Sequence, residues 1–227
     1  MKKITLVVPA YNEEDRISRA ASRFISSKTL SENCRFLFIV DGNDKTYRIL
    51  EGIKQDNPGK EIQIKKYSKR LGKGGAVEEG IKAAKTDYVG FLDVDENLQE
   101  NTIEKMMDVF LEKELDCLIG KRINSRRSSL FREIASKLFN IYVNVLFGIG
   151  ISDTQCGCKF FKKKLVYSGA GEVFRIRGFA FDIELLEQVK NHGGKITEYR
   201  IENREYGGGK FSLWDSPKMF LDLLTLR

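Results

Sequence analysis

The first half of the chain alternates short apolar segments with segments of helical spacing, and this alternation restricts the possible folds most strongly. The apolar segments predict strands at 4–10, 35–41, 61–67, 88–93 and 116–122. The segments between them predict helices at 13–27, 44–55, 74–85 and 102–113. Near-continuous apolar strands separated by helices are typical of a mostly parallel sheet that is covered on both faces. We therefore predict an α/β fold.

The second half of the chain is less regular. Helices are predicted at 130–147, 181–191 and 216–226, and a strand at 196–202. The chain has 227 residues with only three prolines, and no repeat or proline-rich linker divides it. We therefore expect a single domain over 1–227. The regular alternation of strands and helices ends after about Arg122, which divides the domain into 1–122 and 123–227.

Charge and cysteine content narrow the classes of partner. Lys and Arg together number 39 against 32 acidic residues, which gives a net charge of +7 and suits anionic ligands such as nucleic acid, membranes or phosphorylated compounds. The four cysteines are too few for a disulfide scaffold and indicate a reducing compartment. Cys156 and Cys158 with the single His192 make a poor zinc ligand set, and His192 is expected at a helix end.

The N-terminus is expected to form a buried strand, not a signal peptide, and no apolar stretch reaches the ~18 residues of a spanning helix.

Acidic residues follow three of the predicted strands. Glu13 comes shortly after the first strand, Asp41 ends the second, and Asp93 and Asp95 end the fourth. Ligands of open parallel sheets bind beyond the carboxyl ends of the strands, so these carboxylates are expected at one ligand-binding edge. There they could hold a hard cation and a ligand group. The structural alternative is that each residue is a turn or helix-cap residue.

A glycine-rich turn, LGKGGAV at 71–77, lies between the third strand and the following helix. It lacks the spacing of a P-loop and the third glycine of the dinucleotide-binding fingerprint. One interpretation is a tight turn that begins a helix. The other is a helix N-terminus that presents Lys73 to a phosphate or a sugar hydroxyl.

Six motifs in this order resemble the family 2 glycosyltransferases of the GT-A fold, and among them the dolichyl-phosphate glucose and mannose synthases. The segments that carry the resemblance are VVPAYNEE at 7–14, VDGNDKT at 40–46, RLGKGGAVEEGI at 70–81, FLDVDEN at 91–97, DTQCGCKFF at 153–161 and NREYGGGKFS at 203–212. Four positions depart from the family pattern, namely Gly42, Val94, Cys158 and Gly209. The resemblance implies a Rossmann-like nucleotide-diphospho-sugar transferase domain with a mostly parallel central sheet. It makes 1–122 the nucleotide-sugar-binding half and 123–227 the acceptor-binding half with amphipathic helices.

The resemblance also implies roles for individual residues. On the donor side, the base and ribose would be held by Pro9, Tyr11, Glu13 and Asp41, and the nucleotide and sugar would be contacted by Asp93, Val94 and Arg122. Mg²⁺ or Mn²⁺ would bind Asp95 with Asn97, and the diphosphate would be closed over by Arg204 and Lys210. Arg132 and Asp153 would face the acceptor phosphate. The catalytic set is therefore expected to be Asp95, Asp153, Arg204 and Lys210.

The segment 130–151 is apolar around most of a helix, with a narrow polar stripe formed by Glu133, Lys137, Asn140 and Asn144. It is either a packing helix of the core or an interfacial helix that meets lipid. Basic residues before it, among them Arg126 and Arg127, and after it, Lys159 and 162–164, favour an anionic membrane surface.

Together these features predict a metal-dependent glycosyltransferase that inverts the anomeric carbon. It would move a hexose from a nucleotide-sugar, with UDP-glucose favoured and GDP-mannose second, to a polyprenyl (dolichyl) phosphate. A phosphate acceptor is already anionic near neutral pH, so Asp153 is expected to orient the acceptor or a cation and not to take a proton. We expect a peripheral protein on the cytoplasmic face of the membrane, and leave open a membrane subunit as partner.

Two kinds of alternative remain. The enzyme could act on a growing glycan or another lipid, or the protein could bind nucleotide-sugars without turnover. Nucleic acid is not expected as a partner, because acidic strand ends repel phosphates unless a metal ion intervenes.

Overall fold

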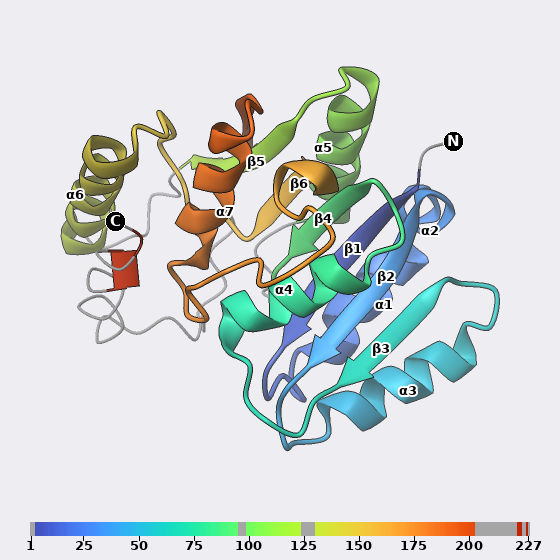
Figure 1. Ribbon diagram of the computed structural model, residues 1–227. Coiled ribbons are helices and arrows are strands. Elements are labelled where there is room, and N and C mark those ends of the chain that lie inside the picture. Colours follow the sequence, from blue (N-terminus) through green and yellow to red (C-terminus); the bar gives the residue numbers. More distant parts are fainter. Residues whose placement is uncertain (1–2, 95–98, 124–129, 203–221, 224–225, 227) are drawn as a thin grey trace.

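The computed structural model describes residues 3–94, 99–123, 130–202, 222–223 and 226, with the backbone alone for 130–137. A twisted sheet runs through this part of the chain in the order β3-β2-β1-β4-β6-β5-β7 (Figure 1). Its strands are β1 Ile4–Ala10, β2 Cys34–Val40, β3 Ile62–Lys66, β4 Tyr88–Leu92, β5 Cys117–Ile123, β6 Cys158–Lys162 and β7 Ile196–Glu202. All neighbouring pairs are parallel except those of β6, which is antiparallel to both β4 and β5. The predicted mostly parallel α/β sheet is confirmed.

Helices cover both faces of the sheet (Figure 1). They are α1 Ile17–Ser26, α2 Lys28–Asn33, α3 Thr46–Asp56, α4 Gly72–Ala83, α5 Glu100–Glu112, α6 Leu130–Phe147 and α7 Phe181–Asn191, with a short 3₁₀ turn at Lys163–Leu165. Helix α4 lies directly on β1, because a Cβ built at Gly80 would be 2.2 Å from Cγ1 of Val7. Helices α1 and α5 lie on the other face and share the Arg23–Glu100 ion pair at 2.9 Å.

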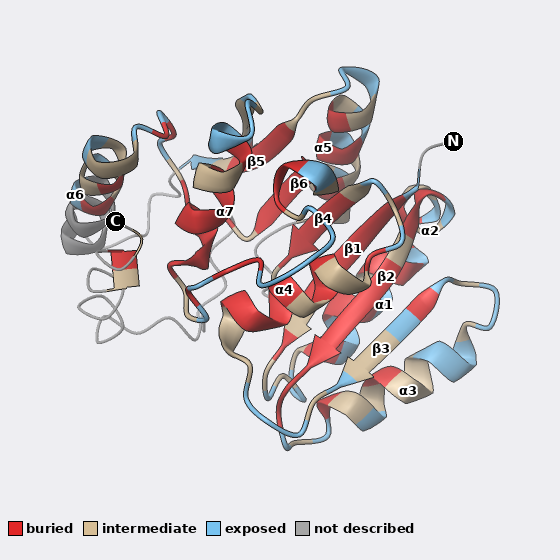
Figure 2. Ribbon diagram, in the orientation of Figure 1, coloured by how far each residue is buried: buried red, intermediate tan, exposed pale blue. Residues whose placement is uncertain are grey.

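The core follows the strands. Six of the seven residues of β1 and six of those of β2 are buried, which agrees with the near-continuous apolar runs of both segments (Figure 2). Strands that are buried on both faces need apolar residues at every position and not at alternate ones. This is why the N-terminal strands could be located from the sequence within one residue at each end.

Two expectations need correction or fall outside the described residues, and one strand was not expected. The helix predicted at 13–27 is present but begins at Ile17, because residues 13–16 form a turn, and a second helix begins after Ser27, whose Oγ accepts a hydrogen bond from the amide of Leu30 at 3.0 Å. Strand β6 was not predicted. Of the terminal helix predicted at 216–226, only residues 222, 223 and 226 are described, and 222–223 are helical. Within the described residues no helix combines the length and apolarity that crossing a membrane requires.

Candidate active site

The carboxyl ends of β1, β2 and β4 meet at one edge of the sheet, as predicted. The strands are parallel and in register, with Ala10 opposite Val40 and Val7 opposite Phe91. The residues that follow them therefore come together from separate parts of the sequence, and Asp41 and Asp93 both lie at this edge.

Asp41 is almost completely buried and directly follows β2. Only 5% of the residue is exposed, and its Oδ2 accepts a hydrogen bond from the amide of Leu71 at 2.8 Å. Burial raises the pKa of Asp41 above its ordinary value, although hydrogen bonds from the amides of Leu71 and Gly72 oppose the shift. Beside it, the guanidinium of Arg70 lies 4.3 Å from the ring centroid of Tyr11. The sequence motifs had singled out Tyr11 and Asp41 but not Arg70.

Pro9 and Glu13 lie on either side of Tyr11. Pro9 is within β1, opposite Ile39 of β2. The carboxylate of Glu13 forms an ion pair with Arg16 at 2.8 Å, and its amide donates to Oγ1 of Thr46 at 2.8 Å. Glu13 therefore fixes the turn before α1 in addition to any contact with a ligand.

The departure from the family pattern at Gly42 has a steric explanation. A Cβ at this position would lie 2.3 Å from Oδ1 of Asn12. That oxygen accepts a hydrogen bond from the amide of Asn43 at 3.0 Å, which joins the ends of β1 and β2. A second aspartate at position 42 would displace Asn12, so the turn requires glycine here.

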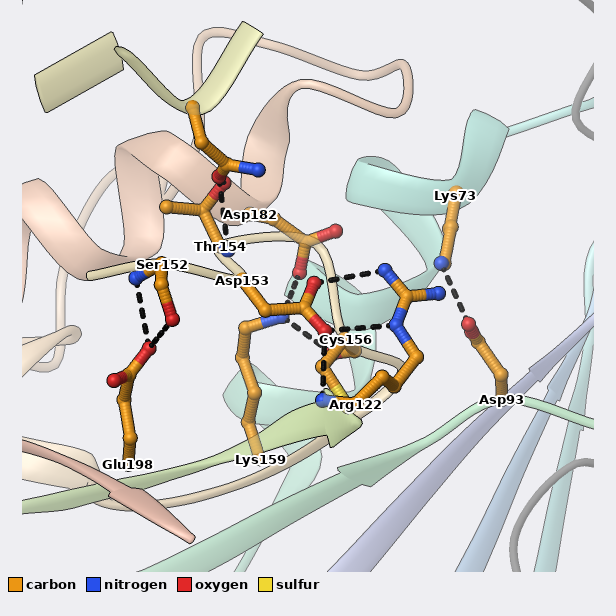
Figure 3. A network of polar contacts seen from close by, with 11 residues as sticks. Lys73, Asp93, Arg122, Ser152, Asp153, Thr154, Cys156, Lys159, Asp182 and Glu198 are labelled. Atoms are coloured by element: carbon orange, nitrogen blue, oxygen red, sulfur yellow. Dashed lines mark hydrogen bonds and ion pairs between the residues drawn. The ribbon is translucent and has the colours of Figure 1, made fainter. Parts of the chain in front are cut away.

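Lys73 and Asp93 form the ion pair nearest the end of β4. Lys73 stands in the first turn of α4, and its Nζ lies 2.9 Å from Oδ2 of Asp93 (Figure 3). The neighbouring Val94 is buried, with 4% of its surface exposed. The expectation that the glycine-rich turn begins a helix is confirmed, and the contact of Lys73 with a phosphate or a sugar hydroxyl stays a prediction.

The glycines of this turn allow close packing. Gly72 has a φ of +75°, and a Cβ at Gly74 would lie 2.4 Å from the carbonyl oxygen of Ile176. The amide of Gly74 donates to the carbonyl of Arg177 at 2.9 Å. The start of α4 thus rests directly on the segment before α7.

Arg122 and Asp153, assigned to the donor and the acceptor respectively, contact each other. The guanidinium of Arg122 binds both carboxylate oxygens at 2.8 Å, and its amide donates to Oδ2 at 3.0 Å (Figure 3). Burial would raise the pKa of Asp153, but the hydrogen bonds and charge of Arg122 outweigh it and hold this pKa below its ordinary value. Asp153 is therefore an ionised carboxylate near neutral pH.

The polar stripe of α6 holds the loop that carries Asp153. Oδ1 of Asn144 accepts from the amides of Gly150 and Ile151 at 2.7 and 3.2 Å, and Oδ1 of Asn140 accepts from Oγ1 of Thr154 at 3.1 Å. Leu138, Ile141 and Val145 lie outward instead, with 60%, 59% and 77% of their surface exposed. Phe139 and Val143 of the same helix are buried in the core, so the described part of α6 has one apolar side toward the protein and a second apolar side that is exposed.

A buried ion pair lies beside the Arg122–Asp153 pair, and it includes Lys159, which had been expected among the basic residues at a membrane surface (Figure 3). Lys159 of β6 is completely buried, and its Nζ lies 2.5 Å from Oδ1 of Asp182 in the first turn of α7 (Figure 3). Burial raises the pKa of Asp182, while the charges of Lys159 and Lys73 lower it and that of Asp93 raises it further. The signal in the sequence is a lysine between the apolar residues of CKFFK at 158–162.

Several predicted site residues lie outside the described part of the chain. They are Asp95, Asn97, Arg204 and Lys210, together with the side chain of Arg132. Among the described residues no group of three potential metal ligands forms, and Asp93 is engaged by Lys73. The oxygens of Asp95 and Asn97 stay the predicted ligands of Mg²⁺ or Mn²⁺, and they are the ligand type that these hard cations prefer.

The cysteine thiols and the histidine are poorly suited to metal binding or nucleophilic attack. All four cysteines are buried and free, and burial raises the pKa of Cys156 to about 12. Such a thiol stays protonated, so it is a poor metal ligand and a poor nucleophile. His192 follows the last turn of α7, as predicted, with Nδ1 2.8 Å from the carbonyl oxygen of Gln188.

Comparison with known proteins agrees with this geometry. A dolichyl-phosphate beta-glucosyltransferase of Dictyostelium discoideum is 30% identical to this chain, over 99% of the chain and 73% of that protein. The dolichyl-phosphate beta-glucosyltransferase of Homo sapiens is 28% identical, over 100% and 75%. Among solved structures, glucosyl-3-phosphoglycerate synthase of Mycobacterium tuberculosis superposes with a TM-score of 0.71 at 17% identity, over 99% of this chain and 79% of that one.

A second structural neighbour supports the same fold. Mannosyl-3-phosphoglycerate synthase of Rubrobacter xylanophilus also gives a TM-score of 0.71, at 16% identity, over 99% of this chain and 72% of that one. Both neighbours are glycosyltransferases with the GT-A fold, which this chain shares. Residues 5–169 match the family described as Glycosyl transferase family 2. The chain belongs to glycosyl transferase family 2.

Proposed function

We propose that this protein transfers a hexose from a nucleotide-sugar to a polyprenyl (dolichyl) phosphate, with inversion at the anomeric carbon. The observation that carries the proposal is the meeting of two charged pairs, Lys73–Asp93 and Arg122–Asp153, at the carboxyl edge of the sheet (Figure 3). The similarity to dolichyl-phosphate beta-glucosyltransferases over almost the whole chain supports glucose as the sugar and dolichyl phosphate as the acceptor. UDP-glucose is therefore the favoured donor, and GDP-mannose is second.

The donor side of the proposal uses the ends of β1, β2 and β4. The buried carboxylate of Asp41 can accept hydrogen bonds from a base or ribose, and Tyr11 beside it offers a ring for stacking. Lys73 at the start of α4 adds positive charge near the helix N-terminus, where a phosphate is stabilised. A divalent cation on Asp95 and Asn97 would neutralise charge that develops on the leaving diphosphate.

The acceptor side uses Arg122 and Asp153. A lipid phosphate carries its own negative charge near neutral pH and needs little help from a base. Asp153, kept ionised by Arg122, is a weak base and is suited to orienting the acceptor and the guanidinium that binds it. A direct attack by the phosphate oxygen on the anomeric carbon inverts its configuration. Nucleoside diphosphate glucose is α-linked, so this agrees with the β product in the names of the relatives.

One assay tests donor, acceptor and metal together. Labelled UDP-glucose, GDP-mannose and other nucleotide-sugars are incubated with the protein and Mg²⁺ or Mn²⁺, with and without dolichyl phosphate. We expect a labelled lipid only when dolichyl phosphate is present, with UDP-glucose giving the highest kcat/KM, and an anomeric configuration opposite to that of the donor. Chelation of the metal should stop the reaction.

The result could contradict the proposal in three ways. Retention of configuration would exclude direct displacement. Transfer to a glycan but not to dolichyl phosphate would favour the alternative acceptor. Metal-dependent nucleotide-sugar binding without any turnover would identify a binding protein.

We further propose that α6 meets the membrane surface. The exposed Leu138, Ile141 and Val145 recur at spacings of three and four residues, so they form one apolar face of the helix. The opposite side holds the loop of Asp153 through Asn140 and Asn144. A lipid phosphate at a membrane surface, on the cytoplasmic side in our proposal, would thus be close to the acceptor residues. The proposal leaves room for a membrane subunit.

Vesicle binding tests this placement. We expect the protein to co-sediment with anionic liposomes and, at higher salt, to bind them less, because each basic residue near an anionic surface contributes about 1 kcal/mol. Reversal of charge at Arg126 and Arg127 should weaken binding by at least about tenfold on the same principle. Lys54→Glu with Lys85→Glu is the matched control, since both lysines are exposed and the net charge changes equally. Absence of binding, or an equal loss in the control, would contradict the proposal.

A further inference from the structure

Lys159 occupies an unusual place for a charged side chain. It lies in β6 at the centre of the sheet, opposite Phe91 of β4 and Ile119 of β5, and its neighbours Cys158 and Phe160 are completely buried. Within the described part of the chain it forms an ion pair with Asp182, which is 2% exposed. Removing two charges from water is costly, and apolar residues of similar volume often stabilise a protein at least as well as such a pair. Stability alone therefore gives little reason for a lysine here.

The ammonium of Lys159 reaches the segment that carries Asp153. Its Nζ donates a hydrogen bond to the carbonyl of Cys156 at 2.7 Å, in addition to the ion pair with Asp182. The next carbonyl, that of Gly157, accepts a hydrogen bond from the amide of Asp93 at 2.9 Å. Two successive peptide groups of the segment are thus held by a lysine of β6 and by the residue that follows β4.

The same segment packs against the side chain of Asp93. A Cβ at Gly157 would lie 2.2 Å from Oδ2 of Asp93, so the backbone approaches this carboxylate more closely than any other residue type would allow. At its other end, the segment begins with Asp153, which Arg122 holds with two hydrogen bonds of 2.8 Å. Residues 153–157 therefore form a short bridge between Asp153 and Asp93.

We propose that Lys159, held by Asp182, is a positioning residue that fixes residues 153–157 and so sets Asp153 relative to Asp93. This inference rests on the proposed function, in which Asp93 contacts the donor and Asp153 the acceptor. Reacting groups must be held within a fraction of an ångström for efficient transfer, and a displacement of about 1 Å can cost about 10²-fold in rate. Loss of the hydrogen bond to Cys156 would allow such a displacement without removing any group that touches substrate.

A pair of variants separates positioning from stability. Lys159→Met leaves the carboxylate of Asp182 buried without its ammonium, and we expect a marked fall in Tm. Adding Asp182→Leu removes both charges and should restore Tm to near the wild-type value. If Lys159 positions the site, the double variant still transfers sugar with a kcat reduced at least tenfold, while the Kd of the donor nucleotide changes less than threefold. A double variant with wild-type Tm and wild-type kcat would overturn the proposal.

Two further variants complete the test. Lys162→Met removes another lysine of β6. Lys162 pairs with Asp116 at 2.7 Å, at the edge of the sheet opposite to the site, so this variant should leave kcat unchanged. Asp182→Asn keeps an oxygen that accepts from Lys159, so kcat should fall less than threefold even if the double variant does not fold. A tenfold loss in Asp182→Asn at unchanged Tm would refute positioning through Cys156. Absence of transfer by the wild-type protein would instead refute the proposed function.

Discussion

Asp95→Ala is expected to abolish sugar transfer. Asp95 is the second aspartate of the DVD motif and is the residue proposed to hold Mg²⁺ or Mn²⁺ on the diphosphate. A bound cation stabilises charge on the leaving group by several kcal/mol, and each 1.4 kcal/mol corresponds to about a tenfold change in rate. We therefore expect kcat/KM to fall by at least about 10²-fold. The measurement is product formation from labelled donor, with metal-dependent nucleotide binding by calorimetry as the second readout.

Asp87→Ala is the matched control for this prediction. Asp87 is exposed and precedes β4, so it lies at the amino end of the strand whose carboxyl end leads to Asp95. It should transfer sugar at the wild-type rate. If Asp95→Ala kept both its activity and its metal-dependent affinity for the nucleotide, the metal assignment would be wrong.

The N-terminal half of the fold could be predicted from the sequence because its signals are local. Strands β1 and β2 are apolar at almost every position, and the helices between strands show their own spacing. Strand β6 gave no such signal, since its five residues include two lysines and its place between β4 and β5 depends on pairing with segments distant in the sequence. The insertion of an antiparallel strand into a parallel sheet depends on tertiary contacts, and the hydrophobic periodicity of the sequence does not predict it.

Some residues of the site could be predicted from the sequence in the same way, and others could not. Asp41, Asp93 and Lys73 could be found because they stand at strand ends or helix starts, where the topology of a parallel sheet brings ligand-binding residues together. Asp182 was not singled out, and Lys159 was wrongly expected among the basic residues at a membrane surface, because only the packing of β6 against α7 reveals that the two residues form a buried pair. The contact between Arg122 and Asp153 was missed for the same reason, although both residues had been chosen.

Asp153→Asn is expected to reduce transfer by about 10²-fold, the usual effect of removing one electrostatic contact in an active site. Asparagine keeps the shape and one acceptor oxygen but loses the charge that binds both nitrogens of Arg122. The guanidinium is then free to turn, and the acceptor phosphate loses its orientation. We expect the effect in kcat and in KM for the lipid phosphate, with the donor nucleotide Kd nearly unchanged. Asp116→Asn, at the amino end of β5 and paired with Lys162 at 2.7 Å, is the matched control and should keep full activity.

The dependence of this effect on pH tests whether Asp153 is ionised throughout the neutral range. Because the pKa of Asp153 is lowered in the folded protein, its ion pair stabilises the fold above the ordinary aspartate pKa of about 3.9, and this contribution is lost as pH falls through the lowered value. Asp153→Asn should therefore lower Tm at pH 7, and the difference should shrink in acid. Between pH 6 and 8 the carboxylate stays ionised, so the ratio of wild-type to Asp153→Asn rates should be constant. A ratio that rises with pH in this range would show that Asp153 ionises there, and would contradict the lowered pKa.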